Sequence, residues 1–168
     1  MILDKFDEIK KGECCPQCGH SKLYPLSDRR SKCANCYHRF SPDKEKDGCY
    51  ILEYFAKERS APRTAKFLQF SNGKVYRAYR KFRQEILEYS DKKNILRRIP
   101  ISQIRKIPRD KELTGFKAFV KERLKRLPRI SKKHLPLYQR EFEFRYHYRK
   151  EKILPILIKI HFGSASNQ

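Results

Sequence analysis

The chain has 168 residues, and its 41 lysine and arginine residues outnumber 19 acidic residues to give a formal net charge of +22. This charge calls for a polyanionic partner, with nucleic acid ahead of an anionic membrane surface. No apolar run is long enough for a transmembrane helix, and Asp4, Asp7 and Glu8 exclude a signal peptide, so we expect a cytoplasmic protein. Because only 39% of residues are hydrophobic, small packed modules are expected rather than one large core.

Four segments follow a short lead of residues 1–12. Residues 13–42 hold five of the six cysteines and predict a zinc ribbon, and residues 46–90 have the periodicity of a helix-turn-helix. Residues 91–112 are a basic linker that contains two prolines, and residues 113–163 favour helices again. The predicted fold class is therefore mainly α, with a small N-terminal zinc ribbon, a helix-turn-helix and C-terminal helices.

Two CxxC pairs, Cys15 with Cys18 and Cys33 with Cys36, are separated by fourteen residues. One tight turn in each pair aims two sulfurs at one ion, and two such turns complete the tetrahedral shell that zinc prefers. Gly19 permits the positive φ that such a turn often needs. We expect structural zinc, because four sulfurs leave no open position for catalysis. Disulfides are disfavoured in a reducing cytosol, and a redox pair would need a βαβ context that is missing.

The other thiols and imidazoles of this region are not predicted to bind the metal. Cys14 lies one residue too far from Cys18 for the same turn, and Cys49 is expected to be a small buried residue beyond the ribbon. His20 and His38 are expected at the surface or facing DNA. The ribbon also carries cations that make it a plausible DNA-contact module or a merely solvated face, namely Lys22, Arg29, Arg30, Lys32 and Arg39.

Three helices are predicted for the helix-turn-helix. Residues 48–57 place Ile51, Leu52 and Phe55 on one helical face. Ser60 and Pro62 suit the start of a second helix over 61–68, and a short turn at 70–73 leads to a third helix from about 74 to 88. The buried stripe of the third helix is expected to comprise Val75, Ala78, Tyr79, Phe82 and Ile86.

The opposite face of the third helix carries the candidate DNA contacts. Exposed arginine, lysine and glutamine at the start of the last helix are what readout of the major groove requires. A helical hairpin with a solvated basic face is the alternative interpretation. The candidates are Lys74, Arg77, Arg80, Lys81 and Gln84.

The C-terminal segment also has helical spacing. One helix is expected from Leu113 to a stop at Pro128, and another from Pro155 to Gly163. Between them, residues 135–146 fit a helix, although the alternation of Phe142, Phe144, Tyr146 and Tyr148 would also suit a strand. We predict a helix there.

The ordered segments resemble bacterial insertion-sequence transposases that combine a zinc ribbon, a helix-turn-helix and an ISXO-two-like catalytic domain of the DDE type. The resemblance covers about residues 13–90 and 112–162. It implies binding of double-stranded DNA at the ends of a mobile element, DNA transposition by two-metal phosphoryl transfer, and no small-molecule substrate. It rests on CYHRFS at 36–41, SAPRTAKFLQFSNGKVYRAYRKFRQEI at 60–86, GFKAFVKERLKRL at 115–127 and LPLYQREFEFRYHYR at 135–149.

Departures from the family pattern predict that catalysis is lost. The third catalytic position corresponds to Thr114, the family tryptophan to Lys117 and its asparagine to His147, whereas Lys121 matches. The central part of the family's domain, with two catalytic aspartates, has no counterpart. We therefore expect an internally deleted, catalytically inactive protein with no catalytic residues, no complete RNase-H-like sheet and no functional magnesium.

Three further expectations accompany this hypothesis. The C-terminal helices, without a sheet to cover, must pair with each other, pack on the helix-turn-helix or self-associate into a homo-oligomer. DNA binding would place the protein on the nucleoid. The alternatives are a zinc-ribbon and helix-turn-helix transcriptional regulator, an RNA-binding factor, or an active transposase.

Overall fold

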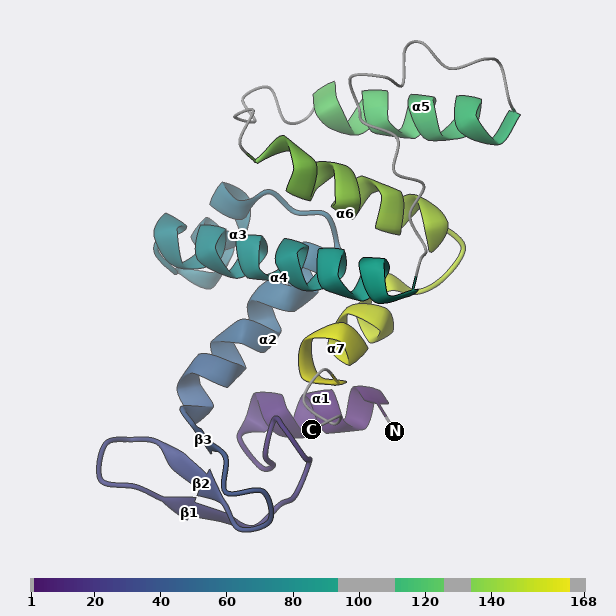
Figure 1. The fold of residues 1–168 in the computed structure, drawn as a ribbon. Helices are drawn as coiled ribbons and strands as arrows, with labels where there is room; N and C mark the ends of the chain where they lie inside the picture. Colours follow the sequence, from purple (N-terminus) through teal and green to yellow (C-terminus); the bar gives the residue numbers. More distant parts are fainter. Residues whose placement is uncertain (1, 94–110, 126–133, 164–168) are drawn as a thin grey trace. The chain divides into compact units, whose positions relative to one another are not determined.

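The computed structural model describes residues 2–93, 111–125 and 134–163 (Figure 1). In these ranges the chain is mainly helical, with one small sheet, so the predicted fold class is confirmed. The chain forms two compact units. The first unit comprises Met1–Phe82 with Ile153–Gln168, and the second unit comprises Arg83–Lys152.

The sheet of the first unit consists of β1 (Leu23–Pro25), β2 (Ser31–Cys33) and β3 (Arg39–Phe40), which pair antiparallel in that order. Alternation along the strands turns Cys33 and Phe40 inward, where Leu23 packs on them. Three strands of two or three residues do not amount to an RNase-H-like sheet, and the described residues contain no other strand.

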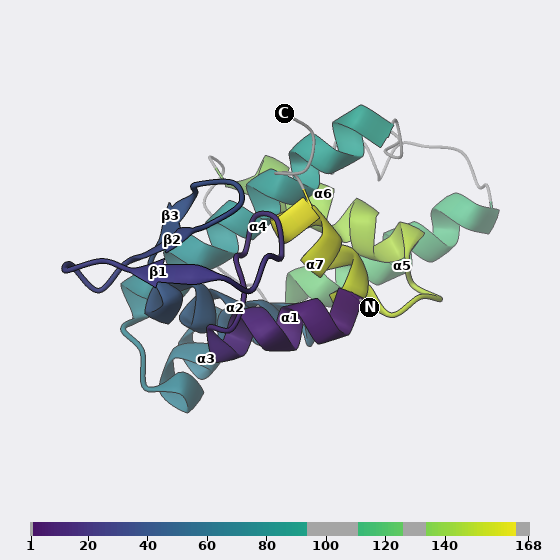
Figure 2. The same ribbon diagram turned by 90° about the horizontal axis from the view of Figure 1, so that it is seen from below.

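Helix α1 (Ile2–Lys11) occupies the segment that was expected to be a short lead. Its buried side chains are Phe6 and Ile9, and Gly12 follows with a φ of 80°, a conformation that suits glycine at the end of a helix. Helices α1, α2 (Pro42–Ala56) and α7 (Ile153–Gly163) lie side by side, as Figure 1 and Figure 2 show. The rings of Phe6 and Phe162 meet at 6.2 Å. The last predicted helix therefore packs on α1 and α2 within the first unit.

Helices α2, α3 (Ala61–Leu68) and α4 (Asn72–Lys93) correspond to the predicted helix-turn-helix. Helix α2 begins earlier than predicted because Pro42 suits the first helical turn. Helix α3 has the predicted bounds and ends at Gln69, whose φ is 55°. The Ser71 hydroxyl then accepts a hydrogen bond from the backbone N–H of Lys74 at 3.3 Å. Helix α4 continues to Lys93 and takes in the first residues of the predicted linker, of which 94–110 lie outside the described residues.

One buried contact fixes how α3 meets α4. The Tyr79 hydroxyl donates to the backbone carbonyl of Arg59 at 3.0 Å and lies 2.8 Å from the Thr64 hydroxyl, which therefore acts as donor to it. Phe55 of α2 packs against the rings of Tyr79 and Phe82 at 4.9 and 5.4 Å. The start of α4 is thus tied to both preceding helices.

The second unit contains α5 (Lys111–Lys125), α6 (Leu135–His147) and the last turns of α4. Residues 135–147 form a helix, as predicted, rather than a strand. Helices α5 and α6 pair with each other through Tyr146, whose ring lies 5.2 Å from Phe116 and 5.3 Å from Phe119. A Cβ at Gly115 would come within 2.6 Å of the Tyr146 hydroxyl, so a larger residue at this crossing would require the Tyr146 side chain to shift. The predicted stop at Pro128 lies outside the described residues.

Candidate metal centre and nucleic-acid interface

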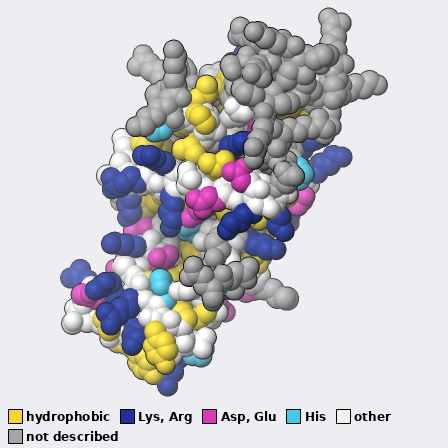
Figure 3. Space-filling model, in the orientation of Figure 1, with side chains coloured by type: hydrophobic (Ala, Val, Ile, Leu, Met, Phe, Trp, Pro, Cys, Tyr) yellow, Lys and Arg dark blue, Asp and Glu magenta, His cyan; other side chains and the backbone are white. Residues whose placement is uncertain are grey.

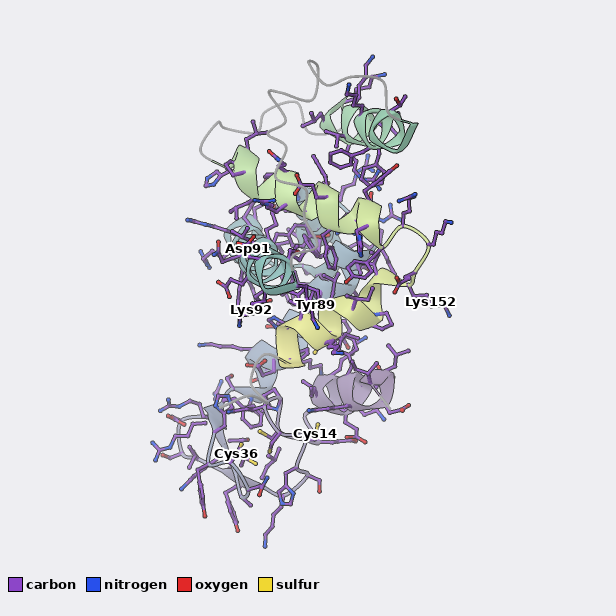
Figure 4. All side chains as sticks on the ribbon, turned by 45° about the vertical axis from the view of Figure 1, so that its right-hand side comes forward. Cys14, Cys36, Tyr89, Asp91, Lys92 and Lys152 are labelled. Atoms are coloured by element: carbon purple, nitrogen blue, oxygen red, sulfur yellow. The ribbon has the colours of Figure 1, made fainter. Side chains whose placement is uncertain are left out.

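Four cysteine sulfurs converge at the base of the sheet. The Sγ atoms of Cys15 and Cys36 are 3.6 Å apart, those of Cys18 and Cys33 are 3.5 Å apart, and all four lie within 4.8 Å of one another. Zinc–sulfur bonds of about 2.3 Å in a tetrahedron require sulfur–sulfur distances of about 3.8 Å. The four predicted ligands are therefore gathered at a spacing that can hold a metal ion of this size. In Figure 4 the sulfur atoms gather beside Cys36.

The two CxxC turns have nearly the same backbone conformation. The N–H of Cys15 donates to the carbonyl of His20 at 2.9 Å, and the N–H of Cys33 donates to that of His38 at 2.9 Å. The residue after the second cysteine has a positive φ in both turns, 79° at Gly19 and 58° at Tyr37. A Cβ at Gly19 would approach only the flexible end of the Lys5 side chain, at 3.0 Å, so the positive φ is the main reason for glycine there. Gly19 thus has the positive φ that was predicted for it, whereas the positive φ of Tyr37 was not predicted.

Without a bound cation, the surroundings favour the thiolate form at some of the four cysteines and oppose it at others. Burial opposes the ionisation of Cys18, but hydrogen bonds from the His20 backbone and the neighbouring thiols lower its pKa to about 6. Burial raises the pKa of Cys15 to about 12 and also raises that of Cys36. A bound divalent cation favours the thiolate form of all its ligands, so metal binding and proton release are coupled here.

The two remaining cysteines stay outside the cluster. Cys14 is 1% exposed, and its sulfur contacts the backbone carbonyl of Lys5 at 4.0 Å. Burial, with a contribution from Glu8, raises the pKa of Cys14 to about 11. Cys49 is fully buried in α2, and burial raises its pKa to about 12. Both are therefore protonated thiols in the apolar interior, and Figure 4 shows Cys14 beside α1.

Helix α4 carries all five predicted DNA contacts. Arg77, Arg80, Lys81 and Gln84 are exposed. The buried stripe on the opposite side of the helix includes Val75, Tyr79, Phe82 and Ile86. Gln84 lies beyond the end of the first unit and donates a hydrogen bond to the Glu88 carboxylate at 3.3 Å. The exposed basic face of α4 within the first unit, here called the α4 basic face, therefore consists of Arg77, Arg80 and Lys81.

Lys74 is the half-buried residue among the five predicted contacts. Its ammonium group forms an ion pair with Asp47 of α2 and lies 4.0 Å from the centre of the Phe70 ring. The periodicity of α4 placed Lys74 on the same face as Arg77, but a side chain twenty-seven positions earlier holds it. Lys74 therefore contributes to the packing of α4 on α2.

Two exposed tyrosines of the ribbon were not among the predicted site residues. Tyr24 is 48% exposed and Tyr37 is 67% exposed. A lysine ammonium lies over each ring, that of Lys22 over Tyr24 at 5.8 Å and that of Lys32 over Tyr37 at 5.0 Å. Their signal in the sequence was the interleaving of tyrosine with lysine and arginine along the ribbon.

No protein-family model, curated protein or solved structure matches this chain. Among the helices that the structure describes, none combines the length and the apolar composition needed to cross a bilayer. The functional argument therefore rests on the geometry of the cysteine cluster and of the α4 basic face.

Proposed function

We propose that the protein binds double-stranded DNA through helix α4 and derives from an insertion-sequence transposase whose catalytic domain is largely deleted. The observation that carries the proposal is the α4 basic face. Three exposed cations lie on the last of three packed helices, on the side away from the buried stripe. Such a helix fits the major groove and contacts phosphates and base edges.

The helices around α4 support this role. Tyr79 ties α4 to α3 and to the turn before it, so α4 is held at a fixed angle to its neighbours. Lys74 is held by Asp47, so we assign the contacts of α4 with base edges and phosphates to the exposed residues Arg77, Arg80 and Lys81. Recognition of element ends rests on the resemblance of the ordered segments to the transposase family.

We propose zinc as the ion of the cysteine cluster. Four cysteine sulfurs that lie within 4.8 Å of one another are the ligand set of structural zinc sites, which keep no open position. Zinc would hold the two CxxC turns together and supply most of the stability of a ribbon whose buried cluster is small.

Loss of catalysis is the remaining part of the proposal. The family chemistry needs carboxylates that converge on a sheet. Within the described residues the only sheet is the small one of the ribbon. Asp91 is exposed near the end of α4, where Figure 4 labels it. Asp110 lies outside the described residues, as does the side chain of Glu112.

The test is duplex binding measured by fluorescence anisotropy across a salt series. The variant Arg77→Ala/Lys81→Ala removes two exposed cations of α4. We expect it to bind at least about tenfold more weakly and to reduce the slope of log K against log salt by up to about 1.8, because each phosphate contact contributes about 0.9. Lys44→Ala/Lys46→Ala removes the same charge from exposed positions of α2 and is the matched control.

Unchanged affinity and salt slope in Arg77→Ala/Lys81→Ala would refute the role of α4. Structured RNA of equal length distinguishes the alternative of an RNA-binding factor, since that function predicts tighter binding to RNA than to duplex DNA. Incubation of the duplex with magnesium or manganese tests for cleavage, and cutting that Asp91→Ala abolishes would contradict the proposed loss of catalysis.

A further inference from the structure

The outward face of the ribbon sheet carries one continuous row of side chains. Strand pairing places Tyr24 opposite Lys32 and Lys32 opposite Arg39. The alternate residues Cys33 and Phe40 point the other way, into the sulfur cluster. The row Tyr24–Lys32–Arg39 therefore crosses all three strands on the side away from the candidate metal centre.

Two neighbours extend this row. The Lys22 ammonium lies 5.8 Å from the centre of the Tyr24 ring, and the Lys32 ammonium lies 5.0 Å from that of Tyr37. We call these five residues the ribbon outer face. Figure 3 shows dark blue cations beside yellow hydrophobic side chains over the strands at the lower end of the view.

Tyr37 occupies a position that its own packing does not explain. Its φ of 58° is unfavourable for a residue with a Cβ, and the equivalent position of the first CxxC turn is Gly19. With 67% of its surface exposed, the ring contributes little to the core of the ribbon. The CxxC turn imposes this φ, and the ring that it presents is exposed beside Lys32, where a ligand can contact it.

The cations of the ribbon outer face suit an anionic ligand, and its aromatic rings suit a ligand that has flat groups. Lys22, Lys32 and Arg39 are cations, and the described strands carry no acidic residue. The nearest acid along the hairpin, Asp28, already forms an ion pair with Arg30. Cations that follow a phosphate backbone, interleaved with rings that stack on bases, are the combination that binds unpaired nucleotides.

We propose that the ribbon outer face binds single-stranded nucleic acid, with Tyr24 and Tyr37 stacking on bases and Lys32 and Arg39 contacting phosphates. A duplex buries its bases within the helical stack and so offers these rings no base face. This surface is separate in residues from the α4 basic face, and its function does not depend on duplex binding.

The first experiment uses the absence of tryptophan from the chain. Tyr37→Trp introduces a single tryptophan, which stacking on a base quenches. We expect saturable quenching when oligo-dT is added to the metal-loaded full chain. Phe67→Trp is the matched control, because Phe67 is 71% exposed on α3, away from the strands. Equal quenching of the two variants would overturn the proposal.

The second experiment measures affinity for labelled oligo-dT and oligo-U. Tyr24→Ala/Tyr37→Ala should weaken binding by at least about fivefold per ring, whereas Tyr24→Phe/Tyr37→Phe keeps both rings and should bind as the wild type does. The oligomer that binds more tightly shows whether the surface prefers single-stranded DNA or RNA. Wild-type affinity of the alanine variant overturns the proposal, provided that its metal content and circular dichroism match the wild type. Retained oligo-dT binding by Arg77→Ala/Lys81→Ala separates this surface from that of α4.

Discussion

Glu141 of α6 is a buried carboxylate between two arginines, and its replacement by glutamine tests how the second unit is stabilised. The residue is 6% exposed. Its carboxylate accepts hydrogen bonds from the Nε atoms of Arg83 at 2.6 Å and of Arg145 at 2.8 Å. The arginine side chains are only 11% and 3% exposed. Glu141→Gln keeps the shape of the side chain and leaves two guanidinium groups buried without an anion between them.

We expect this change to lower the free energy of unfolding of the second unit by about 3–5 kcal/mol, the cost of breaking a buried ion pair by removing one partner. For a unit of this size each kilocalorie corresponds to about 4–8 °C in the melting temperature, so a loss of at least about 12 °C is predicted. Thermal unfolding followed by circular dichroism measures the change, and hydrogen exchange of α6 peptides assigns it to this unit. Glu122→Gln, at an exposed position of α5, is the control.

The pH dependence provides an independent test of the same ion pair. Burial opposes the ionisation of Glu141, but the charges and hydrogen bonds of Arg83 and Arg145 outweigh it and lower its pKa. A lowered pKa stabilises the folded state above the unfolded pKa of about 4.3, and this contribution is lost as the pH falls through the folded value. The difference between wild type and Glu141→Gln should therefore shrink as the pH falls below the unfolded pKa of about 4.3. A loss below about 1 kcal/mol at neutral pH, or a loss independent of pH, would refute the reasoning.

Two further predictions concern the first unit. Tyr79→Phe removes the hydroxyl that links Thr64 to the Arg59 carbonyl, so it should cost about 1–3 kcal/mol in urea unfolding. Adding Thr64→Val to Tyr79→Phe should recover part of the lost stability, because neither hydroxyl is then left without the other. If the stability losses of the two single changes simply add, the two hydroxyls are not coupled. Metal analysis should find one zinc ion per chain, and chelation or Cys36→Ser should unfold the ribbon while Cys49→Ala retains the metal. Loss of zinc from Cys49→Ala alone would show that the ligand set is wrong.

The cysteine cluster could be predicted because each of its halves is local. Two residues between cysteines suffice to form each turn, and the four sulfurs meet when two such turns pair. The conformation of the second turn could not be predicted in the same way, because Gly19 marks the first turn while Tyr37 takes the positive φ in the second. A glycine is a readable signal of this conformation, whereas a tyrosine is not.

Contacts between residues that are far apart in the chain could not be predicted from the sequence. Helix α1 had a local signal in the spacing of Phe6 and Ile9, but the acidic and basic residues around them resembled a solvated lead. The pairing of Lys74 with Asp47 depends on how α4 packs on α2, which no periodicity reports. For the same reason the spacing of α7 predicted a helix but left its partner open, with packing on the helix-turn-helix as one alternative, and the contact of α7 with α1 was not predicted.

The position of α7 also affects how the protein is made. Phe162 packs on Phe6, and His161 lies 5.1 Å from the ring of Phe82, yet everything from Arg83 to Lys152 must be synthesised before α7. At about 5–20 residues per second, the side of α1 that Phe162 covers stays open to water for several seconds on every nascent chain. A hydrophobic surface open for that time is accessible to chaperones and proteases, so a codon change that slows translation between α4 and α7 lengthens the exposure without altering one amino acid.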